Sequence, residues 1–249
     1  MRSKILIFTA TYNEADNIEI WYSGVRSVAP GASILVVDDN SIDGTNEKLT
    51  SIQLKDPNFK VITRAGKLGL ASAHRISFDY ALKGGFDFLI TMDADLSHSP
   101  EEMNSLLDKA NIFDFVIGTR RAGGKTDYKG WRRFLSLSGN ILAQLLIPTG
   151  LSEYTTSFRV FNSKAFSILT KQIPTDEGYA FFIEVVELLH INGLKLGEVP
   201  IHFKDRLHGK SKIPRMQIIM SSILLGKLGT HRLFICLRRL NTGFRKSGT

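Results

Sequence analysis

Strand-like and helix-like segments alternate through the first half of this 249-residue chain, and the alternation limits the fold it can adopt. Apolar runs predict strands at 4–10, 33–38, 60–63, 86–92 and 113–118. Helical patterns separate these runs, at roughly 14–28, 43–53, 69–84 and 100–110. Because the runs are continuously apolar, we expect strands that are covered on both faces, as in a parallel sheet. The order predicts an α/β fold with a Rossmann-like, mostly parallel central sheet flanked by helices.

The pattern changes after residue 118. A loop rich in Gly, Lys and Arg (119–133) precedes a predicted helix at 134–147, a strand at 157–161, a helix near 179–192 and a strand at 196–203. Apolar patches broken by charges follow at 213–240, and this pattern is typical of amphipathic helices lying at an interface. Helices that pack back onto the domain are an equally good interpretation. We therefore expect a domain at 1–212 and a basic amphipathic segment at 213–249.

The positive charge is concentrated at the C-terminal end. Residues 201–249 hold eleven Lys/Arg against one acid, so they carry +10, whereas the first 200 residues sum to −2. Candidate partners of such a segment are a phosphorylated substrate, an acidic lipid or nucleic acid. Because apolar residues interleave with the charges, we favour a membrane surface and expect no nucleic acid. The single Cys236 excludes an intrachain disulfide, and the absence of a long uncharged apolar stretch predicts no membrane-spanning helix.

Two aspartates follow the fourth predicted strand as Asp93-Ala94-Asp95. Mg²⁺ and Mn²⁺ prefer oxygen ligands, and Mg²⁺ is commonly bound by one or two carboxylates together with substrate phosphates. Ser97 could add a ligand directly or through water, although turn chemistry explains a serine there equally well. The sequence predicts a metal site formed by Asp93, Asp95 and Ser97.

Polar clusters also follow the other predicted strands, at 9–14, 37–41, 64–69 and 118–121. The carboxyl ends of parallel strands meet at one edge of a sheet, where open α/β folds bind ligands. The first turn lacks Gly-x-Gly-x-x-Gly and no Walker A sequence is present, which argues against dinucleotide oxidoreductases and P-loop enzymes. A calcium loop at 39–50 is also excluded, because its twelfth position is Thr50 rather than Glu.

Four motifs in this order resemble the inverting glycosyltransferases of family 2, which have the GT-A fold. They are Thr11-Tyr12-Asn13-Glu14, the segment 37–45 (VDDNSIDGT), Lys67-Leu68-Gly69-Leu70, and the segment 92–98 (MDADLSH). Later motifs are similar to those of dolichyl-phosphate mannose synthases and related polyprenyl-phosphate sugar synthases: Gly118-Thr119-Arg120, Trp131-Arg132-Arg133 with Ser136, the segment 155–159 (TTSFR), and 197–201 (GEVPI) followed by Arg206 and Lys212. The resemblance covers roughly residues 4–215.

The resemblance implies a role for each matching residue. Nucleotide-sugar binding falls to Ala10, Tyr12, Glu14, Val37, Asp39, Lys67, Asp93, Ala94, Asp95, Arg120, Arg206 and Lys212. Catalysis falls to Asp95, Arg120, Arg132, Arg133 and Ser136, with Mg²⁺ or Mn²⁺ at Asp93, Asp95 and Ser97. Three residues depart from the family pattern: Ala10 replaces a usual Pro, and Glu153 and Thr156 replace a usual Asp and Gly. These departures bear on the identity of the sugar or acceptor.

The implied reaction is transfer of a hexose, foremost mannose from GDP-mannose, to a polyprenyl (dolichyl) phosphate with inversion. A phosphate acceptor is already mostly ionised at pH 7, so it needs capture by arginines rather than a general base. Alternatives are a UDP-sugar donor such as UDP-glucose, a glycan hydroxyl acceptor, or an inactive nucleotide-binding subunit. A lipid acceptor implies a peripheral protein on the cytoplasmic face of a membrane, with the C-terminal segment or small membrane partner subunits as the attachment.

Overall fold

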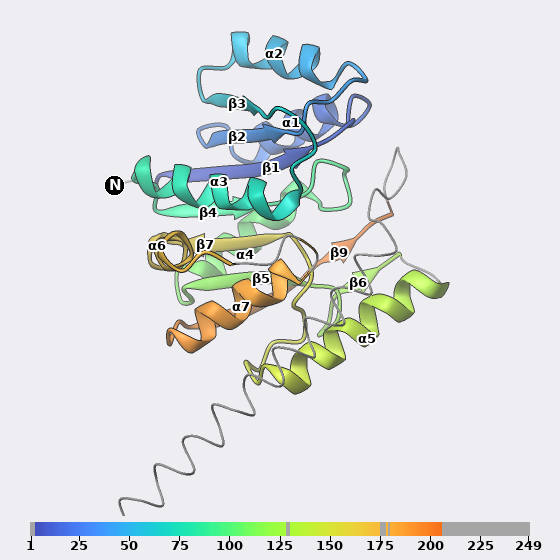
Figure 1. Ribbon diagram of the computed structural model, residues 1–249, viewed down its shortest axis with the longest axis vertical. Helices are drawn as coiled ribbons and strands as arrows, with labels where there is room; N and C mark the ends of the chain where they lie inside the picture. Colours follow the sequence, from blue (N-terminus) through green and yellow to red (C-terminus); the bar gives the residue numbers. More distant parts are fainter. Residues whose placement is uncertain (1–2, 128–129, 175–177, 179, 206–249) are drawn as a thin grey trace, which may run out of the picture.

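A sheet of seven strands in the order β3-β2-β1-β4-β7-β5-β8 runs through the middle of the protein (Figure 1). The computed structural model describes residues 3–127, 130–174, 178 and 180–205. The strands of this sheet are β1 (Ile5–Thr11), β2 (Ser33–Asp38), β3 (Phe59–Thr63), β4 (Phe88–Thr91), β5 (Phe115–Thr119), β7 (Arg159–Asn162) and β8 (Leu196–Pro200). A second, two-stranded sheet pairs β6 (Lys125–Thr126) with β9 (His202–Phe203).

Six of the seven strands run in the same direction, and β7 alone is antiparallel to its neighbours β4 and β5. The central parallel strands β1, β2, β4 and β5 are almost wholly buried, with β5 buried at every residue, whereas the edge strands β3 and β8 are partly exposed. This confirms the mostly parallel sheet predicted from the continuous apolar runs. The reversed direction of β7 brings the segment before Arg159 to the edge at which the parallel strands end.

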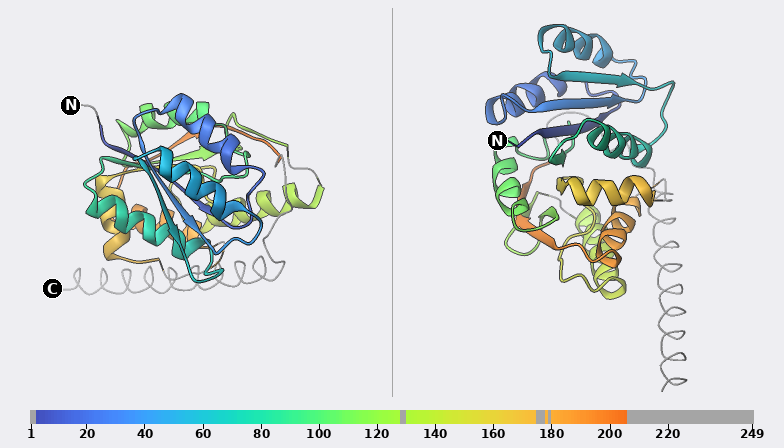
Figure 2. Two further views of the ribbon diagram at one scale, coloured as in Figure 1. Left: turned by 90° about the horizontal axis from the view of Figure 1, so that it is seen from above. Right: turned by 90° about the vertical axis from the view of Figure 1, so that its left-hand side faces the viewer.

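Helices cover both faces of the sheet (Figures 1 and 2). They are α1 (Ile18–Val28), α2 (Thr45–Lys55), α3 (Leu70–Lys83), η1 (Pro100–Glu102), α4 (Met103–Ala110), α5 (Gly130–Leu146), α6 (Ser163–Lys171) and α7 (Phe181–Ile191). Buried side chains of α1, α2 and α4 pack against one face of the strands, around Trp21. Those of α3, α6, α7 and the end of α5 pack against the other face, around Phe161 and Phe166. Neighbouring strand residues alternate between these two cores, which explains why the strands are apolar throughout.

Two local predictions differ from the structure, and one helix was not predicted. Helix α5 begins at Gly130, so part of the loop expected at 119–133 is helical. The strand expected at 196–203 divides into β8 and β9 on either side of Ile201. Helix α6 was not predicted, although Asn162 marks its start by accepting a hydrogen bond from Ala165 N at 3.1 Å.

No helix within the described residues is long and apolar enough to cross a bilayer. The predicted amphipathic helices at 213–240 and the domain boundary at residue 212 lie outside the described residues. Their arrangement therefore stays a prediction.

Candidate active site

The predicted polar clusters lie at one edge of the sheet. In the strand register, Thr11 at the end of β1 is level with Asp38 at the end of β2. Arg159 at the start of β7 is level with Thr91 on β4 and with Ile117 on β5. The loops that follow β1, β2, β4 and β5, and the loop that precedes β7, therefore leave the sheet at the same side.

Asp38 holds the first two loops together. Its buried carboxylate accepts hydrogen bonds from Thr11 Oγ1 at 2.8 Å, Ser41 N at 2.8 Å and Ser41 Oγ at 2.6 Å. Ser41 Oγ in turn accepts from Asn13 N at 2.8 Å. Asn13 and Asn40 adopt positive φ angles, which asparagine tolerates better than most residues. Asp38 thus acts as a cap of the turns.

Two predicted donor-binding residues lie together beside β1. The Lys67 ammonium stands 4.7 Å from the centroid of the Tyr12 ring, a cation–π contact. The nearby Asp39 carboxylate forms a buried ion pair with Arg64 and accepts a hydrogen bond from Gly69 N at 3.3 Å. Burial raises the pKa of Asp39 above its ordinary value, against the opposing charge of Arg64. Tyr12, Asp39 and Lys67 thus belong to loops that the sheet brings to one edge.

The remaining predicted nucleoside contacts differ in their accessibility. Ala10 and Val37 are register partners on β1 and β2; Ala10 is partly exposed, whereas Val37 is fully buried in the core. The Glu14 carboxylate accepts a hydrogen bond from Asn17 Nδ2 at 2.8 Å. The roles of Ala10, Glu14 and Val37 in binding a nucleotide stay predictions.

Asp93 and Asp95 follow β4 with different environments. The Asp93 side chain is 35% exposed, whereas Asp95 is buried and only 4% exposed. Asp95 Oδ1 accepts hydrogen bonds from Ser97 N at 3.1 Å and from Ser97 Oγ at 2.6 Å. Ser97 therefore orients the Asp95 carboxylate here, an arrangement typical of the residues that support a metal ligand. Direct coordination by Ser97 stays a prediction.

His98 supports the same loop from inside the protein. The ring is buried against Phe158 and Phe203, and its Nδ1 accepts a hydrogen bond from Asp93 N at 3.2 Å. Burial lowers the pKa of His98 to about 4, so the imidazole is neutral at pH 7. Leu96, between the aspartates and Ser97, has a φ of 64°. Such a conformation is costly for leucine and is retained mainly at functional sites.

The residues present fit a divalent cation held together with a substrate. No group of three His, Cys, Asp or Glu side chains gathers for a metal within the described part of the chain. Two carboxylates one residue apart suffice for Mg²⁺ or Mn²⁺ when substrate phosphate oxygens and water complete the coordination. Asp93 and Asp95 would be the protein ligands of such an ion.

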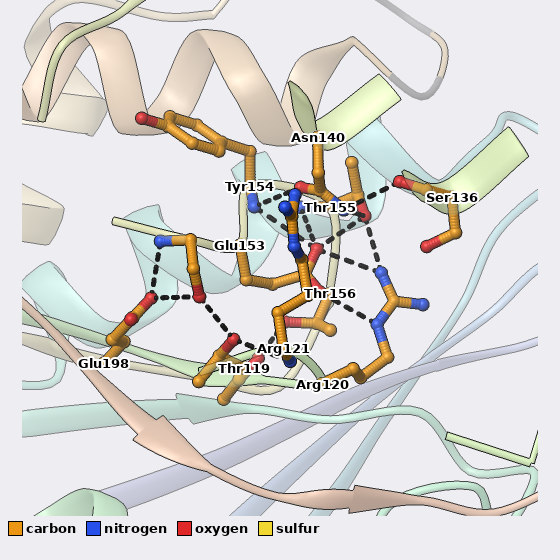
Figure 3. A network of polar contacts seen from close by, with 12 residues as sticks. Thr119, Arg120, Arg121, Ser136, Asn140, Glu153, Tyr154, Thr155, Thr156 and Glu198 are labelled. Atoms are coloured by element: carbon orange, nitrogen blue, oxygen red, sulfur yellow. Dashed lines mark hydrogen bonds and ion pairs between the residues drawn. The ribbon is translucent and has the colours of Figure 1, made fainter. Parts of the chain in front are cut away.

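Arg120, at the end of β5, forms the most extensive polar contact of the site (Figure 3). Its Nε and Nη2 each donate to one carboxylate oxygen of Glu153 at 2.9 Å, and Nη2 also donates to Thr155 Oγ1 at 2.7 Å. The guanidinium carbon lies 5.3 Å from the centroid of the Phe203 ring. Both side chains are buried, with 6% of Arg120 and 0% of Glu153 exposed. The predicted phosphate-binding arginine is therefore fixed in one orientation.

The acidity of Glu153 follows from these contacts. Burial alone would raise its pKa, but the charge and hydrogen bonds of Arg120 and the hydrogen bonds of Thr155 outweigh burial and hold the pKa at about 2. Thr155 N and Thr155 Oγ1 donate to Glu153 Oε1 at 3.0 and 2.7 Å. Glu153 is thus an ionised, fully engaged carboxylate at neutral pH.

Asn140 on α5 connects this pair with Ser136, another predicted catalytic residue (Figure 3). Its Nδ2 donates to Ser136 O at 3.0 Å and to Thr155 Oγ1 at 3.3 Å, and its Oδ1 accepts from Tyr154 N at 2.7 Å. These bonds couple the end of β5, the loop before β7 and helix α5.

A second carboxylate anchors the same loop from another side. Ser152 N and Ser152 Oγ donate to Glu198 Oε2 on β8 at 2.7 and 2.9 Å, and Ser152 Oγ lies 2.8 Å from Thr119 Oγ1. Thr156, one of the departures from the family pattern, donates through Oγ1 to Gly118 O at 2.7 Å. The loop 152–156 is therefore bound to the end of β5 and to the middle of β8.

Four predicted site residues are described incompletely or not at all. Arg132 and Arg133 lie in the first turns of α5, but their side chains are outside what the structure describes. Arg206 and Lys212 lie outside the described residues altogether. The roles of these four residues in binding phosphate stay predictions.

Sequence reasoning missed Asn140 as part of the site, and it missed the contact between Ser152 and Glu198 that anchors the neighbouring loop from outside the site. It identified Glu153 only as a departure from the family pattern. The pairing of Glu153 with Arg120 spans 33 positions, and no local pattern indicates it. The available signal was the position of Glu153 two residues before the start of the Thr155–Arg159 motif.

With this geometry in view, the comparison with known protein families decides the class. The model of glycosyl transferase family 2 matches residues 6–169. The chain belongs to glycosyl transferase family 2. It is a glycosyltransferase with the GT-A fold, as the motifs at the strand ends predicted.

Two relatives of known function align with this chain over most of their lengths. A polyprenol monophosphomannose synthase from Mycolicibacterium smegmatis is 35% identical over 214 residues, covering 84% of this chain and 81% of the relative. An undecaprenyl-phosphate mannosyltransferase from Micrococcus luteus is 32% identical over 212 residues, covering 84% of this chain and 87% of the relative.

Solved structures share the fold at lower identity. Glucosyl-3-phosphoglycerate synthase from Mycobacterium tuberculosis, in complex with Mn²⁺, UDP and phosphoglyceric acid, gives a TM-score of 0.64 at 17% identity and covers 92% of this chain and 79% of that one. A mannosyltransferase from Pyrobaculum calidifontis, in complex with GDP-mannose and Mn²⁺, gives a TM-score of 0.57 at 16% identity. The match covers 85% of this chain and 59% of that one.

Proposed function

We propose that this glycosyltransferase transfers mannose from GDP-mannose to a polyprenyl phosphate, with inversion at the anomeric carbon. The proposal rests mainly on the ion pair between Glu153 and Arg120. Because both oxygens of Glu153 accept hydrogen bonds from Arg120, the acceptor side of the proposed site has an arginine in a fixed orientation, and Glu153 is not a basic carboxylate. The names of the two curated relatives, both mannosyltransferases that act on polyprenyl phosphates, support the same reaction.

On the donor side, Tyr12, Asp39 and Lys67 would bind the nucleoside. Asp93 and Asp95 would bind the metal. A bound Mg²⁺ or Mn²⁺ would neutralise the diphosphate of the leaving group. Asp95 is held for this task by Ser97, and the Asp93 backbone is held by His98. The GDP-mannose and Mn²⁺ complex of the Pyrobaculum mannosyltransferase is consistent with this donor and metal.

On the acceptor side, the proposal needs no general base. A phosphate monoester has a second pKa of about 6, so its oxygen is a ready nucleophile at pH 7. A hydroxyl acceptor would instead have to lose a proton to a basic group. Glu153 has a pKa of about 2, and the neutral His98 already uses Nδ1 to accept from Asp93 N. Neither group is suited to that task, which favours the phosphate.

Helix α5 supports a lipid acceptor through its surface. Four large apolar side chains on it are exposed: Leu137 by 44%, Ile141 by 42%, Leu142 by 38% and Leu145 by 77%. Their spacing of four, one and three residues places them on one side of the helix, whereas the predicted catalytic Ser136 lies on the opposite side, with the buried Asn140. Accordingly, the protein would work at the cytoplasmic face of a membrane, with the 213–249 segment or small membrane subunits as further attachments.

The test is a transfer assay with labelled sugars. GDP-mannose, UDP-glucose and other GDP- and UDP-sugars are offered with a polyprenyl phosphate, in Mn²⁺, in Mg²⁺ and in EDTA. We expect label in the lipid phase from GDP-mannose only when metal is present, and its loss in an Asp95→Ala variant that keeps the native circular dichroism spectrum. Transfer from a UDP-sugar alone would replace the donor. No lipid product with any donor would overturn the proposal and favour an inactive subunit.

A further inference from the structure

We infer that Glu153 is a positioning residue: it holds Arg120 in the orientation that receives the acceptor phosphate and fixes that arginine relative to α5. The inference rests on the proposed function, because the acceptor is taken to be a phosphate. It concerns a residue at which this chain departs from its family pattern, with Glu in place of the usual Asp.

The geometry of the contact between Glu153 and Arg120 restricts the orientation of the arginine. Two nearly equal bonds of 2.9 Å join the edge of the guanidinium to both oxygens of Glu153, and such a paired arrangement fixes the guanidinium plane as well as its position. The Phe203 ring adds a contact to the guanidinium, at 5.3 Å from its centroid. Arg120 therefore has few alternative orientations while Glu153 is present.

Thr155 and Asn140 link Glu153 and Arg120 to α5. Thr155 Oγ1 donates to Glu153 at 2.7 Å and accepts from both Arg120 and Asn140. Asn140 also binds the Ser136 carbonyl oxygen, one turn earlier on α5. A shift of the Glu153 carboxylate would therefore move Arg120 relative to the helix that carries Ser136, and so change the spacing of the two predicted phosphate contacts (Figure 3).

The length of the Glu153 side chain determines where its carboxylate lies. Asp at position 153 would keep the charge but withdraw the carboxylate by about 1.5 Å, the length of one C–C bond. Arg120 could then keep its partner only by moving. Glu153→Asp thus separates the position of the carboxylate from its charge, while Glu153→Gln keeps the length and removes the charge.

The matched control is Glu198→Gln. Glu198 anchors the same loop through Ser152 rather than through the carboxylate pair with Arg120, and a glutamine oxygen can still accept both hydrogen bonds. A general loosening of the loop should affect this variant too. A change that acts only through Arg120 should leave Glu198→Gln unaffected.

The experiment measures KM for polyprenyl phosphate, kcat, and the affinity for GDP with Mn²⁺ in the full-length protein and its three variants. For Glu153→Asp we expect the acceptor KM to rise about tenfold or more, with the affinity for GDP unchanged. Glu198→Gln should keep both values. Wild-type acceptor KM in Glu153→Asp, or an equal loss in Glu198→Gln, would overturn the inference while leaving the proposed function intact.

A second readout does not depend on activity. In nitrogen-15 NMR spectra, the Arg120 Nε–H signal, assigned with Arg120→Lys, should exchange slowly with solvent in the wild type and faster in Glu153→Asp. Rapid exchange in the wild type would contradict the inference even if no lipid product were formed. If Glu153→Gln fails to fold because Arg120 is left buried without its counter-charge, Glu153→Asp still decides the question.

Discussion

At the scale of single residues, the candidate site consists of charged groups that are held by neighbours rather than left to find their positions. Asp95 is held by Ser97, and Arg120 is held by Glu153. Buried charges of this kind are costly unless they are paired or hydrogen-bonded. We propose that these neighbours preorganise the side chains that would bind the metal and the phosphate.

The first prediction concerns Ser97. Replacing it with alanine removes the hydroxyl that donates to Asp95 at 2.6 Å and leaves the carboxylate less firmly oriented. We expect the Mn²⁺ concentration for half-maximal activity to rise about 10- to 100-fold, the usual effect of losing such a supporting bond. Titration of activity with Mn²⁺ measures it, with Ser99→Ala as control because the Ser99 hydroxyl binds Glu101 instead. An unchanged titration curve for Ser97→Ala would refute the assigned role.

At the scale of elements, the site depends on a close approach between the turn after β5 and the link from β8 to β9. Gly124 lies in this turn, where its N–H donates to Arg121 O at 2.9 Å. Lys125 N donates to Ile201 O at 2.8 Å, and Ile201 N donates to Thr119 O at 2.9 Å. These bonds pair β6 with β9 and fix the backbone on either side of Arg120.

The second prediction tests this approach with Gly124→Ala. An added Cβ would press against the Thr119 carbonyl oxygen and lie 2.9 Å from Ile201 O, so the two segments must separate. We expect the free energy of unfolding to fall by about 1–3 kcal/mol, together with reduced transfer. Gly139→Ala on α5 is the control, because nothing lies within 4 Å of its added Cβ. Equal stability of the two variants in thermal unfolding would contradict the account.

At the scale of the whole molecule, both cores contain ionisable groups that the folded state keeps in one charge state. His74 on α3 is packed against the rings of Phe8, Phe181 and Phe182, and burial, followed by the charge of Arg159, lowers its pKa to about 3. Burial likewise lowers the pKa of His98 to about 4. Both imidazoles are therefore neutral in the folded protein at pH 7.

The third prediction is the pH dependence of stability. Below about pH 6.5 the unfolded chain binds protons at both histidines while the folded protein does not. The free energy of unfolding therefore decreases as the pH is lowered. Each histidine contributes a slope of up to about 1.4 kcal/mol per pH unit, down to about pH 4 for His98 and about pH 3 for His74. Below pH 4.5 Glu153 adds a loss of the same sign, because its folded pKa is about 2.

Denaturant unfolding of the wild type and of His74→Leu between pH 7 and pH 5 measures this slope. We expect the variant to be less stable at pH 7 if its packing is imperfect, but to lose less stability on acidification. The same slope in both proteins would show that His74 is not kept neutral by the fold.

The fold could be predicted further than the site. Continuous apolar runs on β1, β2 and β5 identified parallel strands buried on both faces, and motifs at their ends identified the family. The direction of β7 could not be predicted, because a four-residue buried strand has the same pattern in either direction. The Arg120–Glu153 pair was equally out of reach, since it forms only when β7 brings distant loops together.

We propose above that the acceptor is a phosphate, received by arginine without a general base. The most direct measurement offers the enzyme GDP-mannose labelled in the sugar, Mn²⁺, and either a polyprenyl phosphate or the free polyprenol of the same length. We predict labelled lipid from the phosphate and none from the alcohol. Transfer to the alcohol at a comparable rate would contradict it, because the enzyme would then contain a working general base.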